Sequence, residues 1–505
     1  MDTKNFISAI IIVFLLTANN LFSQTNVLNT QAISGLKDLD SFVDSAMKKW
    51  NVPGLAIGIV KDGKVIYCKG YGYRDLKSKD KVTTKTLFSI ASSTKSFTAT
   101  AAALIVDEKK MSFDIPLKTY FPDFQMYDSS AANKITLRDL LTHRTGIPRQ
   151  KFFSLNTPPT RKDVRASMKY FEPNFDFRYM FQYCNEAYTV AGDMVAERAG
   201  TTWEELIKKR LLDPIGMSST IFSYKDLKGK TDYAKPYIDW ADTPEEMDYH
   251  DADILGPAGC IITNAEDLTK WVLFNLNAGK VGDAQIINPK RLKQIQSPQI
   301  VVPIPQSYKE VSHEDYGMGW FIDYYRGFLH INHGGVLYGF SSMVSFLPSE
   351  NTGIVILANL NGTPFTEILE RYVYDRLLKL EPIDWQKRNV DLYEAQKKQF
   401  TNAVEENKKS DSVKIPPLPL ENYAGLYKSD GYGNLDIRLV KDTLKVKLLK
   451  YDCSINYQGD DAFELYHPVE QAGWKTVFIK DNKNNITALS VQVNPNVNPV
   501  IFKKT

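Results

Sequence analysis

Apolar residues recur every three or four positions between Leu36 and Met47, as expected for one face of a helix. Pro53-Gly54 follows and ends this helix. Two apolar segments then flank Asp62-Gly63, a dipeptide that favours a two-residue turn between antiparallel strands. The pattern therefore predicts a helix followed by a β-hairpin over residues 55–72.

The middle of the chain, from Thr84 to about Glu205, has mostly helical spacing, and Gly200 ends its clearest helix. Strand patterns return at residues 328–335 and 341–360, and a further helix follows at residues 366–380. Because strands lie on both sides of a helical insertion, we expect the hairpin and the later strands to form one antiparallel sheet. The predicted fold class of residues 24–380 is α+β, with helices flanking this sheet.

The sequence changes character after residue 380. Residues 381–420 are strongly charged and end in the Pro-rich segment IPPLPL, which is typical of a stiff linker. From residue 421 to residue 505, short alternating segments are separated by turn residues. These residues predict a second, small all-β domain, either a barrel or a sandwich.

The N-terminus has the order of a secretion signal. Lys4 precedes the apolar run Phe6–Leu16, and small and polar residues follow up to Ser23. A membrane-spanning helix needs about 20 apolar residues, so this run is too short, and no later stretch is long and apolar enough. We therefore expect residues 1–23 to be a signal peptide, the mature protein to be periplasmic or secreted, and no integral membrane span to remain.

Composition limits the partners and cofactors. The chain has 62 Lys and Arg against 59 Asp and Glu, and this near-balance gives no reason to expect a nucleic-acid partner. The six histidines show no metal-ligand spacing, so the sequence predicts no metal and no cofactor. The four cysteines are widely spread and fit buried side chains, although one disulfide among them stays open. They are Cys68, Cys184, Cys260 and Cys453.

The strongest candidate for chemistry is the segment SIASSTKSFTATAAALI, in which Ser92 and Lys95 lie one turn apart on a helix face. A serine hydroxyl becomes a nucleophile when a neighbouring base takes its proton. A lysine is such a base only when burial or nearby cations favour its neutral form. Ser92, at the helix start, also has a backbone N–H that can bind an oxyanion. The spacing Ser-x-x-Lys begins at Ser34, Ser45, Ser78 and Ser92, and only the last opens an apolar helix.

A second candidate is Tyr183-Cys184-Asn185, just before a predicted helix. A tyrosine can move protons and an asparagine amide can bind a substrate carbonyl, so Tyr183 and Asn185 suit acyl transfer. Cys184 is expected to point away and pack in the core. The same spacing recurs at Tyr432-Gly433-Asn434, which we interpret as a turn of the β-domain.

A third candidate is His333-Gly334-Gly335 on a predicted strand. Glycines at this place let a substrate backbone approach closely, and the N–H of Val336 can complete an oxyanion hole. The alternative interpretation of His333 is a strand histidine that is hydrogen-bonded within the fold. We expect His143 to fix a loop, and His330 has no predicted task.

In this order, the three motifs resemble the serine β-lactamase and penicillin-binding protein superfamily, and most closely its class C β-lactamase-like branch. The segments ITLRDLLTHRTGIP, GPAGCIITNAEDLTKW, YGMGW and HGGVLYGFSSMVSFLPSENTGIVILAN are also similar to that family. The resemblance covers roughly Leu39 to Leu380 and implies a β-lactamase/transpeptidase-like fold. The C-terminal β-domain resembles the lipocalin-like modules appended to some of these hydrolases.

The resemblance implies a role for each motif residue. Ser92 would be the acylated nucleophile with Lys95 as its base partner, and Tyr183 a proton shuttle and deacylation base. The implied substrate-binding residues are Asn185, His333, Gly335 and Val336, with the N–H groups of Ser92 and Val336 forming the oxyanion hole.

One position departs from the family pattern. Class C β-lactamases usually carry a lysine where His333 stands, and its permanent charge attracts the carboxylate of a β-lactam. Histidine is mostly neutral at pH 7, and it is common in the esterase-like and peptidase-like relatives. The departure argues against a dedicated β-lactamase.

The sequence therefore predicts an exported serine hydrolase of the class C β-lactamase-related family that cleaves an ester or amide through an acyl-enzyme on Ser92. Its partner would be a small-molecule or peptide substrate, and cell-wall peptides are one candidate. The alternatives are a penicillin-binding D-alanyl-D-alanine carboxypeptidase, a true β-lactamase, or a catalytically silent cell-wall ligand-binding protein. Residues 151–180 either form one wall of the pocket or pack as an ordinary loop region.

Overall fold

The computed structural model describes residues 34–156, 160–239, 243–303, 308–392, 415–468 and 472–505. The predicted signal peptide and residues 393–414 of the predicted linker lie outside the described residues. Within the described part of the chain, none of the helices is both long enough and apolar enough to span a membrane.

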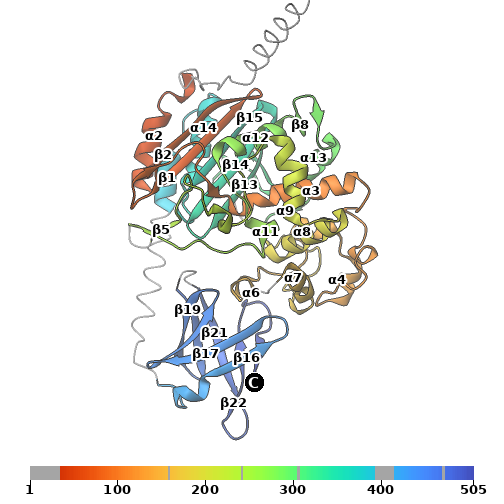
Figure 1. Cartoon of the computed structure of the whole chain (residues 1–505), viewed down its shortest axis with the longest axis vertical. Coiled ribbons are helices and arrows are strands. Elements are labelled where there is room, and N and C mark those ends of the chain that lie inside the picture. The colour runs from red at the N-terminus through yellow and green to blue at the C-terminus, as the bar shows by residue number, and fades with distance from the viewer. Residues whose placement is uncertain (1–33, 157–159, 240–242, 304–307, 393–414, 469–471) are drawn as a thin grey trace, which may run out of the picture.

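One antiparallel sheet of nine strands forms the centre of the first domain, in the order β10-β11-β12-β13-β14-β15-β1-β2-β3 (Figure 1). The predicted hairpin is β1 (Gly54–Lys61) and β2 (Lys64–Asp75), and both turn residues between them have positive φ. β1 pairs with β15 (Thr352–Ala358), so the hairpin and the later strands join in one sheet, as predicted. The other strands are β3 (Asp80–Lys81), β10 (Ile300–Val301), β11 (Asp315–Tyr316), β12 (Phe321–Tyr325), β13 (Phe328–Leu337) and β14 (Phe340–Leu347).

Helices cover both faces of this sheet. On one face lie α2 (Leu39–Lys49) and α14 (Phe365–Leu377), and the side chains that α2 buries include Val43 and Met47 of the predicted apolar face. On the other face, α12 (Ala265–Leu276) crosses β1 closely, since a Cβ at Gly58 would lie 2.3 Å from Thr269 Cγ2. The fold is therefore the predicted α+β arrangement of a sheet flanked by helices.

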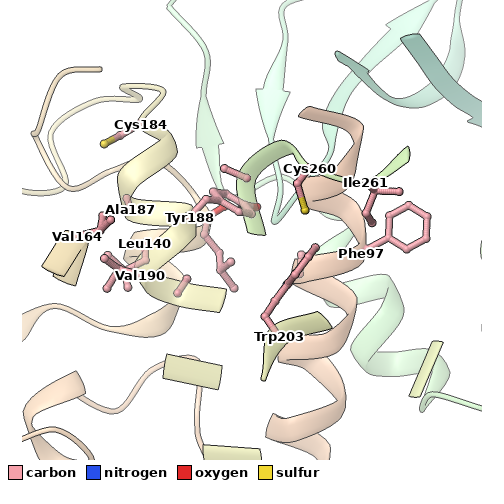
Figure 2. Packing of buried hydrophobic residues seen from close by; sticks show 14 of the residues in the cluster. Phe97, Leu140, Val164, Cys184, Ala187, Tyr188, Val190, Trp203, Cys260 and Ile261 are labelled. Carbon is pink, nitrogen blue, oxygen red and sulfur yellow. The ribbon is translucent and has the colours of Figure 1, made fainter. Parts of the chain in front are cut away.

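The helical insertion lies on the same side of the sheet as α12 (Figure 1). Its longest helices are α3 and α8, which pack together with Tyr188 between them, while Phe97 and Trp203 lie around α3 (Figure 2). Gly200 adopts a left-handed conformation and ends α8, as predicted. The helices are α3 (Thr94–Asp107), α4 (Ser129–Lys134), α5 (Leu137–Leu141), α6 (Lys151–Leu155), α7 (Arg161–Ser167), α8 (Asn185–Ala199), α9 (Trp203–Ile207), α10 (Asp213–Ile215), α11 (Gly256–Gly259) and α13 (Pro289–Ile295).

The C-terminal domain is a closed barrel of eight antiparallel strands, which decides between the two predicted β architectures. The rings of Tyr423, Phe463 and Phe478 pack in it with centroids 4.9 to 5.0 Å apart. Figure 1 shows the barrel at one end of the molecule, next to α6 and α7. Its strands are β16 (Gly425–Ser429), β17 (Gly433–Val440), β18 (Thr443–Leu448), β19 (Tyr451–Gly459), β20 (Ala462–His467), β21 (Ala472–Lys480), β22 (Ile486–Val491) and β23 (Val500–Lys504).

The cysteines do not crosslink the fold. All four lie in the described residues, and each is buried and free of a disulfide. This settles the disulfide that the sequence left open. Cys184 is fully buried at the start of α8, as expected for a packing residue (Figure 2).

Candidate active site

Ser92 lies in a single 3-10 turn, η2 (Ala91–Ser93), directly before α3. Ala91 has a φ of 45°, which is uncommon for a residue with a Cβ. The chain therefore bends sharply just before Ser92. The hydroxyl of Ser93 donates a hydrogen bond to the carbonyl of His333 at 2.8 Å, and this bond holds the turn against β13.

The glycine of the third motif allows this close packing. A Cβ at Gly335 would lie 2.2 Å from Ile90 O and 2.9 Å from Ser92 N. Only glycine fits here without moving one of the two segments. The predicted close approach at Gly335 therefore exists, but the backbone that approaches is that of the Ser92 turn. Val336, the next residue, is 54% exposed and lines the pocket above Ser92.

Lys95 is the buried member of the first motif. Its side chain is fully buried, and its Nζ lies 3.2 Å from Ser92 Oγ. The same nitrogen donates to Asn185 Oδ1 at 2.9 Å and to Ala258 O at 2.7 Å. Burial, and after it the positive charge of Arg149, lowers the pKa of Lys95 well below its ordinary value. A neutral amine can donate its two N–H groups to Asn185 and Ala258 and turn its lone pair toward Ser92.

The second motif lies on the other side of Lys95. Asn185 is the first residue of α8, and because its Oδ1 accepts from Lys95, its amide N–H groups can donate toward the pocket. The ring of Tyr183 lies 4.7 Å from Lys95 Nζ. Burial raises the pKa of Tyr183, so its hydroxyl is protonated at neutral pH and can give a proton to a leaving group.

His143 packs against this second motif and bonds its backbone. Its ring stacks on that of Tyr183 with centroids 4.3 Å apart, and its Nδ1 accepts a hydrogen bond from the N–H of Cys184 at 3.1 Å. The predicted role of His143 in fixing a loop is therefore confirmed. The loop that it fixes is the one that carries Tyr183.

His333 is buried, and both of its ring nitrogens have partners within the fold. Its Nδ1–H donates to Gly334 O at 2.6 Å, its Nε2 lies 3.2 Å from the hydroxyl of Tyr316, and the residue is 1% exposed. Burial, and after it the charge of Lys95, lowers the pKa of His333 to about 3. The imidazole is therefore neutral at physiological pH. This is the environment of a histidine bonded within the fold, which was the alternative interpretation.

The pocket above Ser92 has a cavity volume of about 70 Å³. Asn185, Ala258 and Val336 line it around the nucleophile. Its outer wall is formed by Arg149 and Ser154, together with residues 250–252 and 254–255. Of the stretch 151–180, Ser154 lines the pocket, so this stretch forms part of the wall.

The structure brings the three predicted motifs together around one pocket, although they are far apart in sequence. Sequence reasoning missed three contributors: the carbonyl of Ala258, the hydroxyl of Tyr316, and the guanidinium of Arg149. Ala258 lies in GPAGC, one of the segments that carried the family resemblance. Tyr316 likewise begins YGMGW, another of these segments. Arg149 had no local signal, because tertiary contacts alone bring it to the site.

Comparison with family models covers both domains. A model described as beta-lactamase matches residues 39–379, and a model described as a domain of unknown function, DUF3471, matches residues 409–504. The first match takes in all three motifs. The second falls on the barrel and the residues before it.

Individual proteins are also similar to this chain. The unguisins hydrolase ungD of Aspergillus violaceofuscus is 29% identical over 80% of this chain and 76% of its own length. Protein flp of Staphylococcus aureus strain MW2 is 28% identical over 66% of this chain and 65% of its own length. The octameric penicillin-binding protein homologue from Pyrococcus abyssi matches with a TM-score of 0.61 and 22% identity, over 92% of this chain and 99% of its own. This last likeness confirms the predicted β-lactamase/transpeptidase-like fold.

Proposed function

The chain belongs to the β-lactamase family and is a serine hydrolase, and on that premise we propose that it cleaves an ester or amide bond through an acyl-enzyme on Ser92. The observation that carries the proposal is the 3.2 Å contact between the fully buried Lys95 Nζ and Ser92 Oγ. A lysine in this position with a lowered pKa supplies the base that a serine nucleophile needs.

In the proposed reaction, neutral Lys95 takes the proton of Ser92, and Oγ attacks the carbonyl carbon of the substrate. The N–H groups of Ser92 and Val336 bind the oxyanion, which is typically worth about 2.7–4 kcal/mol per donor. Tyr183 then gives its proton to the leaving group and regains one from Lys95. In the second half, water attacks the acyl carbon and neutral Lys95 takes its proton. The same proton then passes from Lys95 to Ser92 Oγ as the bond between Oγ and the acyl carbon breaks.

We place the protein in the class C-related branch, with esters and uncharged amides as its main substrates. The neutral, 1% exposed His333 supports this choice, because it offers no charge to a β-lactam carboxylate. The exposed cation Arg149 at the outer wall favours a second candidate, a peptidase acting on peptides with a free C-terminal carboxylate. The two candidates differ in whether a substrate carboxylate improves KM.

Mass spectrometry of the intact protein tests the acyl-enzyme. The protein is mixed with p-nitrophenyl acetate, an acylated D-alanyl peptide or a penicillin, and its mass is followed in time. We expect an adduct with the wild type, and none with Ser92→Ala. Ser45→Ala is the matched control, since Ser45 starts the same Ser-x-x-Lys spacing on the exposed side of α2. Adducts that persist in Ser92→Ala would refute the assignment.

We also propose that the protein is exported, which the charge and apolar order around Phe6–Leu16 supports. The test is to express the whole chain in a Gram-negative host and to sequence the N-terminus of the protein in the periplasmic fraction. A mature N-terminus close to residue 24 is the expected result. Full-length protein in the cytoplasm alone would contradict export.

A further inference from the structure

The barrel packs against the helical insertion through several buried aromatic side chains, and one of them is Tyr432. Tyr432, in the turn between β16 and β17, is 4% exposed. Its ring packs edge-on against Phe153 and Phe171, with centroids 6.0 and 5.7 Å away. Its hydroxyl donates to Gln150 Oε1 at 2.7 Å, and Gln150 is itself 4% exposed. The sequence interpretation of this segment as a turn is correct, but the turn is an interdomain contact.

Neighbouring contacts fix the turn on both sides. Asn156 Nδ2 donates to the carbonyl of Tyr432 at 2.5 Å. A Cβ at Gly431 would lie 2.4 Å from Tyr170 Cβ, so the two domains touch without room for a larger residue. Tyr432 therefore cannot leave its site without exposing aromatic surface and breaking buried hydrogen bonds, which is costly.

The segment that receives Tyr432 is also the wall of the active-site pocket. Gln150 immediately precedes α6, and its Nε2 donates to Pro148 O at 2.9 Å, so its side chain links Tyr432 to the backbone on the other side of Arg149. Ser154 of α6 lines the pocket and donates to Glu186 Oε1 at 2.5 Å, next to Asn185. One short segment thus has the barrel on one side and the substrate pocket on the other.

We propose that Tyr432 is a positioning residue of the active site, which through Gln150 and α6 holds the pocket wall that carries Arg149 and Ser154. The barrel then holds this wall in place, and the hydrolase domain depends on the barrel for substrate binding. The predicted effect of the wall on turnover rests on the proposed function. The conclusion that the barrel fixes the wall rests on the contacts alone.

The proposal predicts which kinetic constant changes. Ser92 and Lys95 are held by η2, α3 and β13, and none of the contacts described above for Tyr432 involves these elements. A loosened wall should therefore leave kcat close to its normal value. Substrate binding needs the wall in place, so KM should rise. Loss of one buried hydrogen bond corresponds to roughly a fivefold change.

The test compares two tyrosine-to-phenylalanine variants of the full chain. Tyr432→Phe removes only the hydroxyl that bonds Gln150. Tyr427→Phe is the matched control, because Tyr427 is also fully buried and its hydroxyl bonds Tyr423 O within the barrel at 2.7 Å. We measure amide hydrogen exchange in peptides covering residues 148–156, and kcat and KM for an activated ester such as p-nitrophenyl acetate.

We expect faster exchange at residues 148–156 and a KM about fivefold higher in Tyr432→Phe, with kcat within twofold, and neither change in Tyr427→Phe. Unchanged exchange in Tyr432→Phe, or the same change in both variants, would overturn the proposal. So would an unchanged KM when the wild type turns over the ester. If the wild type turns over no ester, the proposed function fails separately, and the exchange comparison still decides whether Tyr432 holds the wall.

Discussion

The side chains of Ser92 and Lys95 meet at the boundary between the core and the pocket. Lys95 Nζ lies 3.2 Å from Ser92 Oγ, and while the lysine is fully buried, the serine is partly exposed to the pocket. A buried amine with two carbonyl oxygens as fixed acceptors is kept in one orientation. Burial lowers the pKa of this amine, so the same packing that orients Lys95 also makes it a base.

Replacing this base should reduce turnover and leave binding in place. General-base catalysis typically contributes 10²–10⁴-fold, so we expect Lys95→Met to lower kcat by about that factor, because Ser92 then keeps its proton. Stopped-flow measurement of acylation checks this. Lys48→Met is the matched control, since Lys48 ends the other helical Ser-x-x-Lys spacing on the surface of α2. A Lys95→Met enzyme that acylates at the wild-type rate would contradict the assignment.

The charge of Arg149 should be visible in the pH profile. Charged groups that act on Lys95 include Arg149, which lowers its pKa, and Glu186, which raises it. Because Lys95 works in its neutral form, kcat/KM should rise with pH through the pKa of Lys95. Arg149→Gln removes a cation, so the pKa of Lys95 should increase and the rising limb should move to higher pH.

The matched control for this prediction is Arg165→Gln. Its guanidinium is paired with Glu197 and Asp193 and does not line the pocket above Ser92. Profiles are compared at equal ionic strength, because salt screens exposed charges. If the rising limb of kcat/KM moved to lower pH in Arg149→Gln, the predicted direction in which Arg149 shifts the pKa of Lys95 would be wrong.

His333 should not shape the pH profile at all. Its pKa is about 3, so it stays neutral from pH 5 to pH 8. We expect His333→Gln to keep the shape of the kcat/KM profile over this range and to lose about 1 kcal/mol of unfolding free energy with the hydrogen bond to Tyr316. Chemical denaturation and pH-rate profiles measure the two quantities. If a limb with an apparent pKa of about 6 to 7 disappeared in the variant, His333 would be a titrating catalytic group.

Much of the site could be predicted because its signals are local. The Ser92 motif opens an apolar helix, Asn185 stands at a helix start, and Gly335 lies beside a second glycine within a strand. Each feature follows from short-range rules of helix capping and strand packing. The hairpin at β1 and β2 was predictable for the same reason, since two apolar segments flank the turn residues Asp62-Gly63. Its place beside the later strands followed from the strand patterns on both sides of the helical insertion.

The wall of the pocket could not be predicted, because it depends on contacts between distant segments. Tyr432 and Gln150 are 282 residues apart and belong to different domains. The sequence alone identifies Tyr432 only as part of a Gly-rich turn. It identifies Gln150 only as a polar residue after Pro148. Their hydrogen bond exists because two separately folded surfaces fit together, and no local pattern carries that information.

The buried cluster around His330 gives a prediction about stability. Its ring lies between Asp323, 3.1 Å from Nδ1, and Glu370 of α14, 3.1 Å from Nε2. Burial alone would lower the pKa of His330, but the two carboxylates outweigh it and raise the pKa to about 10. No role for this histidine could be predicted from the sequence, because its partners lie on another strand and on a helix that covers one face of the sheet.

Since the pKa of His330 is higher in the folded chain than the ordinary 6.5, its charge stabilises the fold fully below pH 6.5, and this contribution is lost as the pH rises toward 10. Removing one member of a buried ion cluster typically costs about 3–5 kcal/mol. We therefore expect His330→Gln to lower the unfolding free energy by about this amount at pH 6, and the difference from wild type to shrink toward pH 10. Urea unfolding at pH 6, 8 and 10 measures it.

His313→Gln serves as the control for this series. His313 is 69% exposed beside Asp315, so its loss should change stability little at any of the three pH values. Because His330 and His333 are three residues apart on β13, their side chains lie on opposite faces of the sheet. His330→Gln should consequently keep its KM for the ester at temperatures where it is folded. A stability difference that widens with rising pH would mean that His330 is neutral in the folded protein and that the carboxylates hold the proton instead.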